Sequence, residues 1–113
     1  MLLNINGNDI KVKVVFSEKD IQNGMMYKDF DSTFKGMLFM MKEGEHCFWM
    51  KNCIIPLDII FIQDDEIVKI YHNCPPCVTE ECENYCSKAN YVLELKGGSC
   101  KNMDINEGDF IGY

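Results

Sequence analysis

The sequence predicts one mainly β domain, either an antiparallel β-sandwich or a partly closed barrel, with one or two short helices. Short apolar runs alternate with turn residues along the whole chain and predict about eight strands. No stretch has the regular strand and helix rhythm of a parallel α/β fold. The 113 residues suffice for one domain with its own core, and they contain no linker or internal repeat. We therefore expect a single domain over residues 1–113.

The chain begins with a predicted β-hairpin. Its two strands, residues 2–5 and 10–16, flank the dipeptide Asn6-Gly7. Asn-Gly is the strongest short signal for a hairpin, because both residues tolerate positive φ angles. Lysines alternate with valines in the second strand, which indicates one face toward solvent and one toward the core.

A short helix is expected next. Ser17 is a suitable N-cap for a helix from Glu18 to about Tyr27, and Asp20 completes a weak capping box. Gly24 weakens this helix, because glycine loses more backbone freedom than other residues when a helix forms.

The longest apolar run of the chain, residues 57–62, is interrupted only by Asp58 and lies in a predicted strand over residues 57–63. A strand of this composition is expected to be covered on both faces. Pro56 has no amide donor and is expected at the entry to this strand. Other strands are predicted at residues 36–41, 46–51, 66–71, 91–95 and 110–111, with a turn at 42–45, a loop at 72–90 and one helical turn after Ser99. The residues predicted to be buried are Leu38, Ile59, Phe61 and Leu93.

The charge of the chain excludes several partners. The net charge is −7, and all eleven basic residues are lysines. Nucleic-acid-binding proteins present a positive face rich in Arg, so we expect no nucleic-acid partner. The same charge disfavours an anionic membrane surface, and no apolar stretch approaches the roughly 20 residues of a membrane span. The N-terminus shows no secretory signal, so we expect a soluble protein without membrane insertion.

Several motifs together resemble the domain-of-unknown-function 192 family, small β-rich domains of bacteria, archaea and some phages. They cover nearly the full length, in the order Gly24-Met25-Met26, Gly36-Met37-Leu38-Phe39, Phe48-Trp49-Met50-Lys51-Asn52, Pro56-Leu57-Asp58, Tyr91-Val92-Leu93-Glu94 and Gly108-Asp109. Cys53 departs from the pattern, because family members commonly carry Thr there. The family has no established activity, so the resemblance implies a fold and not a function. Many relatives begin with an export signal or membrane anchor that is not seen here, so we do not carry over their envelope location and expect the cytoplasm or a phage particle.

Five residues are candidates for a ligand-binding site: Trp49, Lys51, Asn52, Asp58 and Glu94. The four polar ones lie in or beside apolar strands, where a carboxylate is rarely buried without a partner. In one interpretation they line a pocket together with the indole ring. In the other, Asp58 accepts backbone amides and Lys51 pairs with a carboxylate, so that the cluster only stabilises the sheet.

The four cysteines at positions 74, 77, 82 and 86 form the densest cluster of chemically reactive residues. Disulfides or free structural thiols are one interpretation, and three disulfide pairings within the cluster are open. A zinc site is another, with Cys74, Cys77, Cys82 and Cys86 as ligands. Redox catalysis is disfavoured, because neighbouring glutamates raise thiol pKa values. We expect no cofactor, with zinc as the alternative, and Cys100 as a free thiol.

Three functional hypotheses follow. The first is a non-enzymatic module that binds a small molecule or another protein. The second is a structural or assembly subunit, such as a component of a phage particle. The third is a hydrolase or transferase that uses Asp58, Glu94 and Lys51, although no nucleophile–base motif is visible. A deep pocket holding carboxylates of perturbed pKa would favour the third hypothesis.

Overall fold

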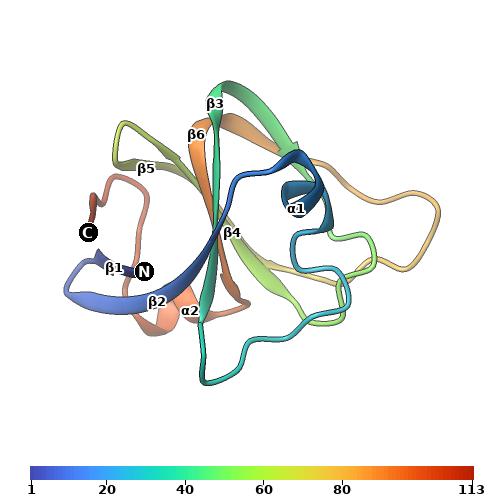
Figure 1. The fold of residues 1–113 in the computed structure, drawn as a ribbon, viewed down its shortest axis with the longest axis horizontal. Coiled ribbons are helices and arrows are strands. Elements are labelled where there is room, and N and C mark those ends of the chain that lie inside the picture. The colour runs from blue at the N-terminus through green and yellow to red at the C-terminus, as the bar shows by residue number, and fades with distance from the viewer.

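A computed structural model describes residues 1–113 as a seven-stranded mixed sheet that curls into a half-barrel, with two short helices (Figure 1). The sheet order is β5-β4-β6-β3-β2-β1-β7. This confirms the mainly β fold, with the partly closed barrel as its form. The elements are β1 (Leu2–Ile5), β2 (Asn8–Val15), α1 (Glu18–Asn23), β3 (Gly36–Phe48), β4 (Leu57–Gln63), β5 (Glu66–Cys74), β6 (Tyr85–Lys96), α2 (Ser99–Asn102) and β7 (Ile111–Gly112).

The pairing of β2 with β3 departs from the antiparallel arrangement of all the other pairs. These two strands run parallel, with Val12 opposite Gly36 and Val15 opposite Phe39. A parallel pair needs a long crossover connection, and residues 16–35 with α1 provide it. In Figure 1, α1 lies on the right of the molecule, away from both chain ends and from α2. The crossover therefore places α1 over one face of the sheet.

The last strand closes part of the barrel. β7 pairs with β1, and the residue before it, Phe110, forms a bridge with Glu66 at the start of β5. The Ile67 amide donates to the carbonyl of Asp109 at 2.8 Å, and the Gly108 amide donates to the carbonyl of Ile67 at 2.8 Å. The two edges of the sheet thus meet at one end only.

Two apolar clusters cover the two faces of the sheet. Along β4 the side chains alternate between them: Ile60 and Ile62 belong to one cluster, and Ile59 and Phe61 to the other. This confirms that the run 57–62 is covered on both faces, with Pro56 just before it. The predicted core residues Leu38, Ile59, Phe61 and Leu93 are all buried.

Strands β3, β5 and β6 extend well beyond the strands predicted from the sequence. Residues 42–45 do not form a turn; they continue β3 through a register shift between Met40 and Gly44. The predicted strand 46–51 ends at Phe48, and the predicted loop 72–90 shrinks to residues 75–84. The polar residues that suggested turns extend the ladder between β3 and β6 at its exposed end, where pairing depends on a distant partner strand.

Helix α1 has the predicted cap but ends earlier than predicted. The Ser17 hydroxyl accepts from the Asp20 amide at 3.1 Å. The helix stops at Asn23 and not near Tyr27, because Gly24 has a φ of 45° and packs against the ring of Phe39. The second helix is capped by Gly98, and the Ser99 side chain makes no capping bond. Neither helix is long and apolar enough to cross a membrane.

We expect Phe61→Ala to lower the free energy of unfolding by about 3–5 kcal/mol, because it removes transfer energy and leaves a cavity. The Phe61 ring is fully buried and makes edge contacts with Phe48 and Tyr71, at centroid distances of 6.0 and 5.9 Å. Urea denaturation measures the effect. Val68→Ala on β5, where the side chain is exposed, is the control and should change stability little. Equal midpoints for the two variants would contradict the placement of β4.

Candidate functional site

The candidate site is a half-open pocket of about 250 Å³ between α1 and the sheet. Its wall is largely apolar, and Glu94 is the one carboxylate that lines it. The lining residues come from α1 and the turn after it (Ile21, Gln22, Asn23, Gly24, Met25, Met26), from β3 (Phe39, Met41, His46, Cys47, Phe48), from the segment after β3 (Trp49, Cys53) and from β6 (Glu94).

Backbone contacts fix the segment that closes the pocket. Met26 forms an isolated bridge with Cys53, and the Tyr27 amide donates to the Asn52 carbonyl at 2.9 Å. Asn52 has a φ of 61°, which asparagine tolerates better than most residues, and its own amide donates to the carbonyl of Cys77 at 3.0 Å. Asn52 therefore ties three segments together and does not line the pocket.

Glu94 is buried near the C-terminal end of β6, with only 3% of its surface exposed. Met37 of β3 and Ile59 of β4 lie opposite it on either side. Burial raises the pKa of its carboxyl to about 8, and neither a hydrogen bond nor an opposite charge lowers it. A buried polar group without a partner is costly, so Glu94 is the least satisfied group of the site.

Cys53 lies close enough to sense the charge of Glu94. Burial is the main cause that raises the pKa of the Cys53 thiol to about 12, and the Glu94 carboxylate adds to it. The thiol therefore stays protonated at neutral pH and is a poor nucleophile. His46, the other titratable side chain of the wall, has its Nε2 atom 2.6 Å from the Lys42 carbonyl oxygen.

Trp49 forms the rim of the pocket, with 43% of its surface exposed. The Lys51 ammonium lies 5.3 Å from the centroid of its ring, a distance at which a cation and an aromatic face attract each other. Lys51 is thus connected to the pocket through Trp49 and does not line it.

Asp58 lies outside the pocket, fully buried, and accepts three backbone hydrogen bonds. Its Oδ1 accepts from the amides of Asn73 at 2.7 Å and Gly98 at 3.1 Å, and its Oδ2 accepts from the amide of Cys100 at 2.9 Å. These bonds join β4 to the end of β5 and to the start of α2. The arrangement matches the structural role considered for this carboxylate.

The two buried carboxylates point to opposite faces of the sheet. Glu94 pairs with Ile59, and Asp58 pairs with Leu95, so the two carboxylates occupy successive positions of one ladder. Directly opposite residues share a face and successive residues alternate, which separates the two side chains. Of the five sequence candidates, the structure brings only Trp49 and Glu94 to the pocket. The grouping of Asp58, Glu94 and Lys51 around one substrate atom does not occur.

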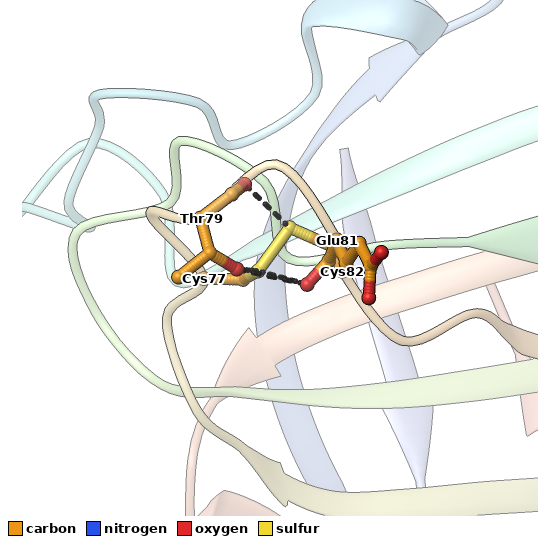
Figure 2. Close-up of a disulfide and its surroundings, with 4 residues drawn as sticks. All are labelled: Cys77, Thr79, Glu81 and Cys82. Carbon is orange, nitrogen blue, oxygen red and sulfur yellow. Dashed lines mark hydrogen bonds between the residues drawn. A yellow bond between two sulfur atoms is a disulfide. The ribbon is translucent and has the colours of Figure 1, made fainter.

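The cysteine loop is closed by a disulfide between Cys77 and Cys82 (Figure 2). Inside it the Thr79 hydroxyl donates to the carbonyl of Glu81 at 2.8 Å, and the Cys82 Sγ lies 3.6 Å from the Thr79 carbonyl. Cys86 pairs with Cys47 of β3, a partner outside the predicted cluster.

Cys74 is thus the one free thiol of the four. Because a disulfide sulfur is not a thiolate ligand, the four cysteines do not form a thiolate set for zinc here. Cys100 is free, as predicted, together with Cys53.

Asp58, His72 and Cys100 also bring potential metal-ligand atoms within 4.8 Å of one another. The Asp58 oxygens already accept three amides, and burial raises the pKa of the Cys100 thiol well above its usual range. A metal would need that thiol deprotonated, so this cluster is better suited to hold the backbone than an ion.

Sequence reasoning missed the residues that α1 and the following turn contribute to the pocket. The motif Gly24-Met25-Met26 was visible, but nothing local indicated that it faces Glu94, about 70 positions away. The contribution of Cys53 was equally hidden. A buried carboxylate in an apolar strand was the one usable signal.

The sequence profile of the DUF192 family, described as “Uncharacterized ACR, COG1430”, matches residues 1–113, in agreement with the resemblance seen in the motifs. Two solved structures are similar. A “putative transcription regulator” from Sinorhizobium meliloti 1021 is 30% identical with a TM-score of 0.83, over 98% of this chain and 89% of that chain. A protein of unknown function from Novosphingobium aromaticivorans DSM 12444 is 25% identical with a TM-score of 0.86, over 99% of this chain and 84% of that chain. No curated protein matches the chain.

We expect Asp58→Ala to destabilise the fold by about 3–5 kcal/mol, because three amides lose a charged acceptor. Asp58→Asn keeps one oxygen but turns a donor toward the Cys100 amide, so it should cost less, about 2–3 kcal/mol. Chemical denaturation of the two variants and the wild type measures the series. A loss below about 0.5 kcal/mol in both variants would contradict the structural role.

Glu94 should make stability depend on pH. Its pKa is about 8 in the fold and near the usual value of 4.5 in the unfolded chain, so unfolding releases a proton between these values. The contribution of this proton to the free energy of unfolding is complete below about pH 4.5 and is lost as the pH rises through about 8. Between pH 5 and 8 the wild type should lose on the order of 3 kcal/mol more than Glu94→Gln. Urea midpoints at both pH values measure this difference, and parallel losses in the two proteins would contradict it.

Proposed function

The chain belongs to the DUF192 family, and from that premise we propose that it is a non-enzymatic binding domain whose small-molecule ligand enters the pocket above Glu94. The observation that carries the proposal is the buried carboxyl of Glu94, which lines an apolar pocket and has no partner within the protein. A few polar groups in a mostly apolar concavity are typical of small-ligand sites. Glu94 would recognise the ligand, and Trp49 would cover it at the rim.

Binding is favoured over catalysis by what surrounds the carboxyl. A hydrolase or transferase needs a second group that acts on the same atom, such as an activated nucleophile or an oxyanion site. The nearby Cys53 is held as a thiol by its raised pKa, and Asp58 projects to the other face. The remaining candidate of the wall, His46, already has its Nε2 atom 2.6 Å from the Lys42 carbonyl oxygen, which counts against a role as the second catalytic group.

The description of the Sinorhizobium meliloti protein as a transcription regulator suggests a regulatory context for such a domain. The net charge of −7 and the absence of Arg count against direct contact with DNA. Within a regulatory context, this domain would supply the binding of a small effector.

A library of small metabolites, screened by thermal shift, tests the proposal. We expect at least one compound to raise the melting temperature of the wild type, because a ligand that binds only the folded state stabilises it. Met41→Trp, which narrows the pocket, should abolish the shift. Leu2→Trp, at an exposed position of β1 outside the pocket, is the matched control and should retain it.

A shift that survives in Met41→Trp would place the ligand elsewhere, and a library without any hit would contradict the proposal. The assembly alternative predicts a different result. It requires a stable oligomer in size-exclusion chromatography whose contacts bury Trp49, and such a finding would favour it over a ligand pocket.

A further inference from the structure

We propose that the ligand of this pocket is a small organic cation, a protonated amine with a compact apolar body, whose ammonium pairs with Glu94. This inference rests on the function proposed above and specifies its ligand class. No lysine lines the pocket, and no positive charge of the protein lowers the pKa of the Glu94 carboxyl. A ligand that brings its own positive charge would complete the pair, with the N–H donors that a carboxylate accepts.

The other residues of the pocket wall are mostly apolar and would contact the hydrocarbon part of such a ligand. Met25 and Met41 contribute flexible thioether side chains, and Phe39 and Phe48 contribute rings that contact each other edge to face at 5.0 Å. The volume of about 250 Å³ is roughly eight times the share of one water molecule in the liquid, about 30 Å³. The ligand is therefore a compact molecule and not a nucleotide or a peptide.

The aromatic rim is a second feature that favours an ammonium group. The centroid of the Trp49 ring lies 5.3 Å from the Lys51 ammonium. The quadrupole of an indole ring attracts any cation, including the ammonium group of a ligand. The net charge of −7 also raises the local concentration of cations around the protein.

A metal ion fits the pocket less well than an organic cation. Calcium and magnesium take six or more oxygen ligands, and the wall offers one carboxylate. Soft metals favour thiolates, but Cys53 is held as a thiol and Cys47 is in a disulfide. The apolar wall is instead suited to the carbon skeleton of an amine.

The proposed pairing predicts a dependence on pH. Glu94 is ionised in about a tenth of the molecules at pH 7 and in about nine tenths at pH 9, given its pKa of about 8. The other titratable groups around the pocket are His46 from β3 and Cys53, with Lys28 acting on Cys53 from beyond α1. An alkyl ammonium, with a pKa close to that of lysine at about 10.4, remains mostly charged at pH 9. The affinity for the amine should therefore rise about tenfold from pH 7 to pH 9.

The test compares n-pentylammonium with 1-pentanol, a neutral probe of similar length, in titrations followed by the fluorescence of Trp49, the single tryptophan. We expect the wild type at pH 9 to bind the amine at least tenfold more tightly than the alcohol. Glu94→Gln should lose at least tenfold in amine affinity and less than twofold in alcohol affinity. Glu80→Gln removes the same charge from an exposed loop and controls for the general attraction of cations to an acidic protein. His46→Gln controls for the second titratable side chain.

The outcomes of this experiment distinguish a failure of the cation assignment from a failure of the proposed binding function. Equal affinities for the two probes, or an amine affinity that does not rise between pH 7 and pH 9 in the wild type, would overturn the assignment to a cation while leaving the pocket as a binding site. If neither probe changes the fluorescence of Trp49 and no compound of the metabolite library binds, the proposed function fails as well. The wild-type comparison holds even if Glu94→Gln folds poorly.

Discussion

Strand β4 and the end of β6, residues 92–95, are buried on both faces of the sheet, and this constraint governs the rest of the structure. A carboxylate placed there is largely removed from water, so its hydrogen bonds come from the protein or from a molecule that enters the pocket. Asp58 and Glu94 are the two charged residues buried there. Asp58 is satisfied by three amides, from Asn73, Gly98 and Cys100, and so joins β4 to β5 and to the C-terminal segment. That segment continues into the strand that closes one end of the barrel.

The sequence allowed prediction of those parts of the fold that depend on local chemistry. Asn6-Gly7 adopts the positive φ angles of a tight turn, and Pro56 precedes its strand, because these effects act within a few residues. Residues 42–45 were wrongly predicted as a turn, since their polar composition concealed a ladder with a partner more than 40 positions away. The parallel pairing of β2 with β3 was missed for the same reason. Pairing across the sheet is a property of the whole chain.

The site was predictable in composition but not in geometry. Burial of a carboxylate in an apolar strand identified Asp58 and Glu94 as unusual, yet their separation onto opposite faces depends on the register between β4 and β6. The disulfide between Cys47 and Cys86 shows the same limit. Its cysteines lie 39 positions apart, and only the ladder between β3 and β6 makes them direct neighbours. Because Cys47 also lines the pocket, this covalent link holds one wall of the site in place.

The contrast between the two carboxylates is the strongest argument for a ligand in the pocket. Asp58 contributes to stability, whereas Glu94 raises the energy of the folded state, because ionisation in its surroundings is opposed by burial alone. A leucine or methionine of similar volume would fill the same space beside Met37 and Ile59 without this cost. Groups that lower stability and hold no other part of the structure in place are characteristic of functional sites, where a bound ligand supplies the missing partner. The unpaired carboxyl of Glu94 therefore points to a ligand more directly than any motif of the sequence does.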